Sequence, residues 1–270
     1  MAEFAARYGR WAVVTGAAQG VGLACTEALI ARGLGVVLVD VDPMVADVAR
    51  ALGDEATARP LIADVADPSW IESLAEPTDG LEVGLAVANA GVAFVGRYLD
   101  MEPARRRAIL EVNCAATADL ASWALPAMVE RGRGGFVATS SGSALAGTGG
   151  VALYSATKAF SINLVEALGW ELADSGVDTL AVVAPTMDTP MFRAGGADPA
   201  RAFAAPVDPR VVVEAALDAL PEGGRWLADE GLRFAAAVDR SERVPMLSLA
   251  TTSMYPGVFE RQAPRPGGAQ

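Results

Sequence analysis

Short apolar runs alternate with segments of helical periodicity along most of this chain. Such runs lie at 11–15, 35–40, 59–63, 81–88, 134–141 and 178–184, and residues 225–228 form a seventh candidate. The run at 81–88 is nearly all apolar, which is typical of a strand buried on both faces of a parallel sheet. The alternation predicts an α/β fold with a doubly wound, mostly parallel seven-stranded sheet of the Rossmann-like kind and helices on both faces.

The size and composition of the chain favour one domain. With 270 residues, of which 52% are hydrophobic, the chain can bury one large core. We expect residues 1–260 to form this domain. Residues 261–270 carry Pro, Gly and Gln and no sustained apolar pattern, so we expect a disordered tail there.

The charge and the residue types that are missing exclude several classes of protein. A net charge of −12 argues against nucleic acid and membrane partners, since both require a basic surface. The absence of histidine excludes Ser-His-Asp and Cys-His mechanisms and histidine-based zinc sites, and no metal site is expected. The N-terminus has no apolar signal segment, and no apolar run approaches the ~18 residues of a membrane span. With Cys25 and Cys114 in apolar helical stretches, we expect a soluble, cytoplasmic protein.

A glycine-rich turn follows the first predicted strand. The stretch Gly16-Ala-Ala-Gln19-Gly20-Val21-Gly22 leads directly into a helical pattern. Glycines let the backbone approach a phosphate closely, and the N-terminus of the following helix offers free N–H groups. Asp40 ends the second strand about 20 residues further on, where an acid can bind an adenosine ribose. The alternatives are a plain tight turn for the glycines and a cap or turn role for Asp40.

Tyr154 and Lys158 are the candidates for acid–base chemistry. Apolar residues recur at helical spacing from Leu153 to Trp170, so positions 154 and 158 lie one turn apart on the same face. A phenol has an unperturbed pKa of ~10, and a nearby cation favours its ionised form. The pair can therefore exchange a proton with an alcohol or a carbonyl. The alternative is an ordinary Tyr and Lys on a surface helix.

Polar residues follow most of the predicted strands. Asp40, Asp64, Asn89, Ser141 and Thr186 come after strands two to six. Because ligands bind at the carboxyl ends of the strands in such sheets, this alignment favours a binding site over scattered turn residues. Asn113 lies inside a helix predicted from Pro103 to Glu130, where a polar side chain is either functional or satisfied within the core.

These motifs occur in the order and spacing of a known family. They are Thr15-Gly16-x-x-x-Gly20-x-Gly22, Asn89-Ala90-Gly91, Asn113, Ser141 and Tyr154-x-x-x-Lys158. Over about residues 8–230 the chain resembles the short-chain dehydrogenase/reductase family, in its compact single-domain branch. The resemblance implies that residues 1–260 are a Rossmann-like, NAD-binding catalytic domain.

The resemblance also implies the catalytic residues. Tyr154 would be the general acid/base, and Lys158 would hold the nicotinamide ribose while favouring the tyrosinate. Ser141, thirteen positions before Tyr154, would orient the substrate oxygen; Ser140 is the weaker candidate. Asn113 would anchor a water in the proton relay.

The implied cofactor site is larger. It comprises Gly16, Gln19, Gly20, Val21, Gly22, Asp40, Asp64, Val65, Asn89, Ala90, Gly91, Tyr154, Lys158, Pro185, Thr186 and Thr189. Asp64 and Val65 would lie near the adenine ring, residues 89–91 on the adenine side, and Thr189 at the nicotinamide carboxamide. The chain departs from the family pattern at Thr186, where Gly is usual, which affects the nicotinamide pocket, and at Thr157, where Ser is commoner.

The expected activity is that of an NAD-dependent short-chain alcohol dehydrogenase or ketone reductase. The expected pocket walls, residues 92–98, 143–150 and 187–203, are mostly apolar and carry Arg97, Arg193 and Arg201. They favour an apolar, ring-sized secondary alcohol or ketone. Two alternatives are a non-catalytic NAD-binding scaffold or sensor, and an epimerase or dehydratase of the longer branch of the family.

Two further expectations concern the cofactor and the assembly. Asp40, with no Arg or Lys in the glycine turn or just after the second strand, predicts NAD in preference to NADP. The helices predicted at 103–130 and 151–174 are apolar on more than one face, which together with the resemblance predicts a homotetramer. The substrate, the preferred direction and the role of residues 244–270 are left open.

Overall fold

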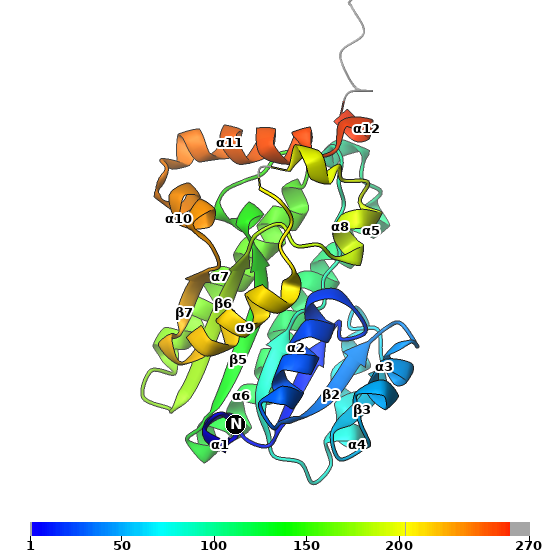
Figure 1. Ribbon diagram of the computed structural model, residues 1–270, viewed down its shortest axis with the longest axis vertical. Helices are drawn as coiled ribbons and strands as arrows, with labels where there is room; N and C mark the ends of the chain where they lie inside the picture. The colour runs from blue at the N-terminus through cyan, green and yellow to red at the C-terminus, as the bar shows by residue number, and fades with distance from the viewer. Residues whose placement is uncertain (1, 203, 260–270) are drawn as a thin grey trace, which may run out of the picture.

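A parallel sheet forms the centre of the computed structural model, in which residues 2–202 and 204–259 are described. The strands lie in the order β3-β2-β1-β4-β5-β6-β7, and every neighbouring pair is parallel (Figure 1). They are β1 (Trp11–Thr15), β2 (Gly35–Asp40), β3 (Ala58–Ile62), β4 (Val83–Ala88), β5 (Gly134–Ser141), β6 (Val177–Ala184) and β7 (Gly224–Leu227). The predicted α/β fold and doubly wound seven-stranded sheet are confirmed.

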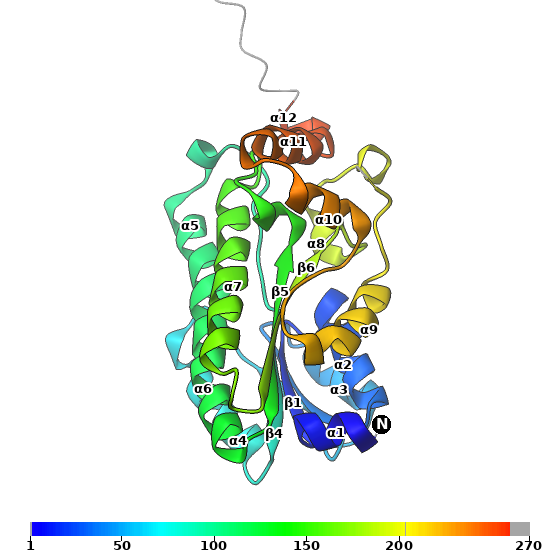
Figure 2. The ribbon, with the colours of Figure 1, turned by 90° about the vertical axis from the view of Figure 1, so that its left-hand side faces the viewer.

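Helices cover both faces of the sheet, as predicted (Figure 2). On one face lie α2 (Gly20–Ala31), α3 (Val45–Leu52) and α9 (Pro209–Ala219). On the other lie α6 (Ala116–Arg131) and α7 (Ala152–Glu171), with α5 (Pro103–Leu110) leading into α6. Three short helices complete this part of the chain: α1 (Ala2–Tyr8), α4 (Ala75–Thr78) and α8 (Pro190–Ala194).

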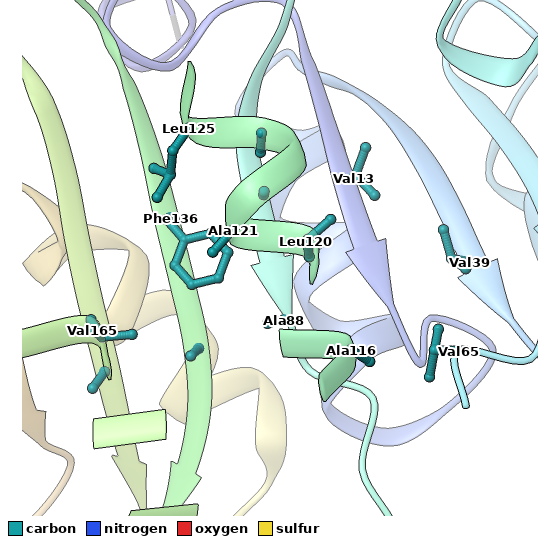
Figure 3. Close-up of a cluster of buried hydrophobic side chains, with 14 of the residues drawn as sticks. Val13, Val39, Val65, Ala88, Ala116, Leu120, Ala121, Leu125, Phe136 and Val165 are labelled. Carbon is teal, nitrogen blue, oxygen red and sulfur yellow. The ribbon is translucent and has the colours of Figure 1, made fainter. Parts of the chain in front are cut away.

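Side-chain alternation along each strand divides the core into two. On β1, Val13 packs with the α6 and α7 side, whereas Ala12 and Val14 pack with the α2 and α9 side. Figure 3 shows the first of these cores, where Phe136 of β5 lies beside Leu125 of α6. Because both faces are buried, the central strands are mostly apolar, and this is why they are recognisable in the sequence.

Strand boundaries are the best predicted feature of the fold. The runs 11–15, 35–40 and 134–141 are strands from end to end, and the other four differ from the observed strands by one or two residues. The α1 helix and the three described helices after β7 were not expected. The short helix expected near residue 68 is mostly a 3₁₀ helix, η1 (Pro68–Leu74), which begins at the Asp67 cap.

The helix predicted from Pro103 to Glu130 is interrupted. It consists of α5, a π-helical turn η3 (Glu111–Ala115), and α6, which continues to Arg131. A π-helical turn widens the helix locally and is often found at functional sites. Five residues are too few to change the apolar periodicity visibly, so the sequence pattern does not reveal this turn. Asn113 lies within it.

The chain after β7 folds over the carboxyl ends of the strands. It forms α10 (Glu230–Ala237), α11 (Arg240–Ser253) and α12 (Pro256–Phe259). Both ribbon views show α11 lying across that end of the molecule (Figures 1 and 2). Residues 244–259, part of the segment whose role the sequence left open, therefore lie in helices that cover the carboxyl ends of the strands.

Two other expectations concern the ends of the chain and membranes. The tail expected at residues 261–270 lies outside the described residues. Within the described part of the chain, no helix combines the length and the apolar character that membrane crossing requires.

Candidate active site

The glycine turn between β1 and α2 lies at the carboxyl edge of the sheet. Gly16 has φ +67°, and a Cβ on it would lie 2.9 Å from Ala90 Cα. A Cβ on Gly22 would lie 1.9 Å from the Gly16 carbonyl oxygen, so any side chain there would collide with the turn. Gln19, the residue before α2, makes no side-chain cap hydrogen bond. The first N–H groups of α2 therefore remain available to an anionic group.

Thr15 and Asn89 hold this turn against β4. The Thr15 hydroxyl oxygen accepts hydrogen bonds from the backbone N–H groups of Asn89 (3.0 Å) and Ala90 (3.1 Å). The Asn89 side-chain amide donates to the carbonyl oxygens of Thr15 (3.0 Å) and Gly16 (3.2 Å). Asn89 is thus a brace for the turn. This role of Thr15 was not predicted, and the only signal for it in the sequence is a hydroxyl at the end of an apolar strand.

Asp40 lies against the glycine turn from the side of β2. One carboxylate oxygen accepts from the Ala18 N–H (2.9 Å), and the other accepts from the Asp42 N–H (3.0 Å). Asp40 therefore stabilises the turns at Ala18 and Asp42, which was the alternative to a ribose-binding role. These two hydrogen bonds leave lone pairs on the carboxylate that can accept further hydrogen bonds. Its position beside the turn is compatible with the ribose interaction as well.

Asp64 and Val65, just after β3, have different environments. Asp64 is exposed, and its carboxylate accepts from the Ala66 N–H at 2.9 Å. Val65 is buried in the core on the α6 side, where Figure 3 places it. The Val65 side chain therefore packs in the core.

Tyr154, Lys158 and Ser141 converge at the end of β5. The Lys158 ammonium nitrogen lies 5.8 Å from the centre of the Tyr154 ring and donates to the Thr139 carbonyl oxygen at 2.8 Å. The Tyr154 phenol hydrogen-bonds with the Ser141 hydroxyl. The three side chains that the resemblance assigned to catalysis thus come together from β5 and the first two turns of α7.

The charge states of this group are governed by burial. Lys158 is 5% exposed, and burial lowers its pKa from 10.5 to about 8, while the nearby Cys114 thiol acts in the opposite direction. Burial also raises the pKa of Tyr154; the Ser141 hydrogen bond lowers it, and the phenol of Tyr255 raises it again. The sequence argument expected the lysine cation to lower the tyrosine pKa. In the structure, burial is the largest cause of the Tyr154 shift, and Lys158 is not among its causes.

The two adjacent serines have separate tasks. Ser140 is buried, and its hydroxyl donates to the Lys158 carbonyl oxygen at 2.7 Å, which ties β5 to α7. Ser141 is half-buried, and its hydroxyl oxygen accepts from the N–H (3.3 Å) and the hydroxyl (3.1 Å) of Ser143. Side-chain alternation along β5 explains this difference, because consecutive residues point to opposite faces.

Asn113 connects the π-helical turn to the site. Its side-chain oxygen accepts from the Val92 N–H at 2.8 Å, and its side-chain nitrogen donates to the Val92 carbonyl and the Thr157 hydroxyl, both at 2.9 Å. The Thr157 hydroxyl in turn donates to the Tyr154 carbonyl at 2.8 Å. The amide is 1% exposed and both of its hydrogens are used, as in the alternative of a satisfied core asparagine. Thr157, where the family more commonly has Ser, links Asn113 to the Tyr154 helix.

Gly91 completes the wall beside Lys158. A Cβ at this position would lie 3.3 Å from the Lys158 ammonium nitrogen and 3.5 Å from the Asn113 side-chain oxygen. A larger residue would crowd both groups. In the Asn89-Ala90-Gly91 motif, Asn89 thus fixes the glycine turn by hydrogen bonds, and Gly91 leaves room for the Lys158 and Asn113 side chains.

The segment after β6 approaches the glycine turn. Thr189 caps α8, its hydroxyl oxygen accepting from the Phe192 N–H at 3.3 Å, and it lies 3.6 Å from where a Cβ on Gly20 would be. Thr186, in place of the family's usual Gly, does not have a positive φ, and its carbonyl accepts from the Val207 N–H at 3.0 Å. Pro185 and Thr186 are half-buried between these contacts. The backbone at Thr186 is therefore unstrained.

Fold and site together define the class of protein. A parallel, doubly wound sheet whose first glycine turn opens onto a helix N-terminus, with an acid at the end of the second strand, is the architecture of dinucleotide-binding α/β proteins. The additional Ser, Tyr and Lys cluster lies at the carboxyl ends of the central strands, where such proteins bind their ligands.

Comparison with known proteins identifies the family. The sequence pattern of the family described as short chain dehydrogenase matches residues 10–200, and the chain belongs to that family. The 7beta-hydroxysteroid dehydrogenase of Clostridium sardiniense is 27% identical over 252 residues, which are 91% of this chain and 97% of the relative. The 1-deoxy-11-beta-hydroxypentalenate dehydrogenase of Streptomyces exfoliatus is 36% identical over 68% of this chain and 70% of its own length.

Other matches bear on cofactor and activity. A putative NAD(P)-dependent gluconate 5-dehydrogenase from Beutenbergia cavernae, solved with bound NADP, has 29% identity and a TM-score of 0.76 over 84% of this chain and 98% of its own. A 3-ketoacyl-(acyl-carrier-protein) reductase from Brucella melitensis, solved with NADH, has the same fold, with a TM-score of 0.76 and 23% identity over 83% of this chain and 98% of its own. The human inactive hydroxysteroid dehydrogenase-like protein 1 is 33% identical over 65% of this chain and 55% of its length. Proteins of this fold have thus been solved with either nicotinamide cofactor, and one relative is named as inactive.

Proposed function

We propose that this protein is an NAD-dependent oxidoreductase that interconverts a secondary alcohol and a ketone. The observation that carries the proposal is the convergence of Tyr154, Ser141 and Lys158 at the carboxyl end of β5, with a hydrogen bond between the first two and a buried amine beside the phenol. None of the three is replaced, which argues against the scaffold or sensor alternative.

The residues around the glycine turn fit a dinucleotide. The space that a Cβ on Gly16 or Gly22 would fill is occupied by backbone, so the turn is tight, and the N-terminus of α2 carries no side-chain cap. Backbone N–H groups at such a terminus suit a pyrophosphate. A bound nicotinamide would supply the hydride acceptor for an alcohol, or the hydride donor for a ketone.

The protein side of the chemistry is proton transfer at the Tyr154 hydroxyl. Because burial raises its pKa, the phenol is protonated at neutral pH and is ready to donate to a ketone oxygen. The Ser141 hydroxyl orients that oxygen and stabilises the phenolate that forms when the proton leaves. Lys158, with a pKa of about 8, is still mostly charged at pH 7 and stabilises the same phenolate. Such proton transfer contributes roughly 10²–10⁴-fold to the rate.

Asp40 supports NAD over NADP. Its carboxylate lies beside the glycine turn, and its hydrogen bonds in the structure come from backbone N–H groups of Ala18 and Asp42. A 2′-phosphate ~4 Å from this carboxylate would be repelled by about 4 kcal/mol at an effective dielectric near 20. We expect Asp40→Asn, which keeps an oxygen for Ala18, to raise the ratio of NADP to NAD use in kcat/KM, whereas Asp64→Asn leaves it unchanged. An unchanged ratio in Asp40→Asn would show that another group discriminates.

The proposed substrate is apolar and ring-sized. The pocket walls expected at residues 92–98, 143–150 and 187–203 consist mainly of apolar residues, and position 203 lies outside the described residues. Two relatives named for hydroxysteroid and hydroxypentalenate substrates agree with this class. Of the cations in these walls, Arg193 pairs with Asp188 at 2.7 Å and is not a free anion-binding group.

A panel of cyclic and aromatic alcohols, assayed for NADH formation, tests the main proposal. The parent should oxidise at least one of them, and Tyr154→Phe should lose turnover while binding NADH with unchanged affinity. Retention of activity within tenfold in Tyr154→Phe would remove Tyr154 from the role of acid/base. NADH binding without turnover of any alcohol or ketone would favour the scaffold alternative.

The proposal extends to a homo-oligomer, expected to be a tetramer, in the cytoplasm. On the α6 and α7 side, Trp170 is 83% exposed, and Val129 and Phe160 are also partly open to solvent. Apolar surface of this kind is typical of a subunit interface. Sedimentation at micromolar concentration should show a species heavier than 27.7 kDa, and Trp170→Glu should weaken it. Cys25 and Cys114 are free thiols, as is usual in a reducing compartment, and cell fractionation tests the location.

A further inference from the structure

A turn of 3₁₀ helix, η4 (Gly142–Leu145), follows directly on Ser141. Ser143 lies in this turn and is half-buried. Its hydroxyl donates to the Ser141 hydroxyl oxygen at 3.1 Å, and its backbone N–H donates to the same oxygen at 3.3 Å. Ser143 is thus a polar group of the site that the proposed chemistry does not use.

The two hydrogen bonds from Ser143 determine what the Ser141 hydroxyl can still do. A hydroxyl group has one donor and two acceptor lone pairs. Since Ser143 fills both lone pairs of the Ser141 oxygen, only the donor remains. Ser141 can then donate to the Tyr154 oxygen or to a substrate oxygen, but it cannot accept the proton of the Tyr154 phenol. The bond between Ser141 and Tyr154 acts to lower the pKa of the phenol, which is the direction expected when Ser141 is the donor.

Buried hydroxyl groups hold Ser143 in place. Its carbonyl oxygen accepts from the Thr148 hydroxyl at 2.9 Å. The Thr148 N–H donates to the hydroxyl oxygen of Ser155, the residue after Tyr154 on α7, at 3.3 Å. Thr148 and Ser155 are both 2% exposed. These bonds tie η4 to the helix that carries Tyr154.

Gly142 lets α10 pack directly on the turn. A Cβ on Gly142 would lie 2.5 Å from the side chain of Leu232, which is buried on α10. The backbone between Ser141 and Ser143 is therefore in contact with α10. Packing as well as hydrogen bonding thus fixes the Ser143 hydroxyl relative to Ser141.

We propose that Ser143 is a positioning residue that acts through Ser141. By occupying the acceptor side of the Ser141 hydroxyl, it directs the Ser141 proton towards the oxygens of Tyr154 and the substrate. The Tyr154 proton then goes to the ketone oxygen and not to Ser141. In the oxidation direction, the same donor stabilises the phenolate that accepts the proton of the alcohol. The inference rests on the proposed function and adds a residue that the resemblance did not assign.

The pH dependence of alcohol oxidation tests this role. Without the Ser143 hydroxyl, a lone pair of Ser141 is free to accept from the phenol, which stabilises the protonated form of Tyr154. Ser143→Ala should therefore lower kcat by about 3–10-fold at pH 7 and move the rising limb of the kcat profile up by about 0.5–1 pH unit. KM for NAD should stay unchanged, because Ser143 is not part of the proposed cofactor site.

Two further variants are the controls. Ser143→Thr keeps the hydroxyl and should behave like the parent. Ser122→Ala removes an exposed hydroxyl that donates to the Ala118 carbonyl at 2.9 Å on α6, and it should change neither kcat nor the limb.

The other ionisable groups near the phenol are common to the parent and all of these variants. They are Lys158, whose nitrogen lies 5.8 Å from the centre of the Tyr154 ring, the phenol of Tyr255 and, beside Lys158, the thiol of Cys114. A difference between the profiles of parent and variant therefore reports on the bond between Ser141 and Tyr154.

A double-mutant cycle separates positioning from a merely structural role. If Ser143 acts through Ser141, Ser143→Ala should have no further effect on kcat in a protein that already carries Ser141→Ala. A loosened turn would instead lower kcat by the same factor in both backgrounds, and that result would overturn the inference. An unshifted limb in Ser143→Ala, or an equal shift in Ser143→Thr, would overturn it as well.

Failure of the proposed function has a different signature. A parent that turns over no alcohol or ketone of the panel would refute the proposed function, and the inference would fall with it. Should Ser143→Ala not fold, Ser143→Cys takes its place, because a thiol is a weaker donor than a hydroxyl. The limb should then shift in the same direction by a smaller amount, and an unshifted limb would contradict the positioning role.

Discussion

Lys158 offers the most direct test of how this site is built, because it is the only lysine in the chain. Burial lowers its pKa from 10.5 to about 8. Since one pKa unit corresponds to about 1.4 kcal/mol, the folded protein bears a cost of about 3 kcal/mol for holding this ammonium group in its charged form. The Thr139 carbonyl, which accepts its hydrogen bond, offsets only part of the lost hydration.

The sign of the effect on stability follows from proton binding. Below pH 8, Lys158 is charged in both the folded and the unfolded chain, and the full cost is present. Between pH 8 and 10.5 the unfolded chain binds the extra proton, so the contribution of this residue to the free energy of unfolding rises with pH. Above 10.5 the residue is neutral in both states and the cost is gone.

Replacement of Lys158 isolates this contribution. Tyr8, Tyr154, Tyr255 and Cys25 have raised pKa values, so their contributions fall with pH, but they are common to the parent and Lys158→Met. The difference in free energy of unfolding, measured by urea titration with tryptophan fluorescence, should be constant below pH 8. It should then change by up to about 3 kcal/mol in favour of the parent towards pH 10.5.

An NMR titration gives the pKa itself. Protein labelled with ¹³C-lysine contains one lysine side chain, so its Cε signal follows Lys158 alone. We expect a midpoint near 8 in the folded protein and near 10.5 in urea. A folded midpoint at or above 10 would refute the argument that burial governs this group.

Three further substitutions follow from contacts in the site. Gly22→Ala should abolish NADH binding and lower the free energy of unfolding, measured by urea titration, by at least about 3 kcal/mol, because the new Cβ would lie 1.9 Å from the Gly16 carbonyl oxygen. Gly147→Ala is the control: its Cβ would face open space, so neither NADH binding nor stability should change. Thr157→Val should lower the free energy of unfolding by about 1–3 kcal/mol and reduce kcat, because the Asn113 amide and the Tyr154 carbonyl each lose a hydrogen bond. Thr157→Ser keeps the hydroxyl and should retain the stability and the kcat of the parent; if it does not, the linking role of Thr157 is contradicted. Ser141→Ala should reduce kcat by about 10²-fold, while Ser140→Ala should mainly lower the unfolding free energy.

Local chemistry made much of the fold predictable. A strand buried on both faces must be mostly apolar, so β1, β2 and β5 were found at their observed boundaries. The glycine turn and the Tyr154 helix were also readable, because backbone freedom at Gly16 and the one-turn spacing of Tyr154 and Lys158 depend on neighbours in the chain.

The tertiary structure alone decided what depends on distant residues. Asn113 is satisfied by Val92 and Thr157, which lie 21 and 44 positions away, and no local pattern distinguishes that amide from one that binds water. The pKa directions of Lys158 and Tyr154 follow from burial, which a sequence does not measure. The packing of α11 against the loops around the site depends on hydrogen bonds to residues about a hundred positions earlier, such as the bond between Gly149 and Ser248. Residue spacing determines which groups share a strand or a helix face, but only packing determines which of them meet.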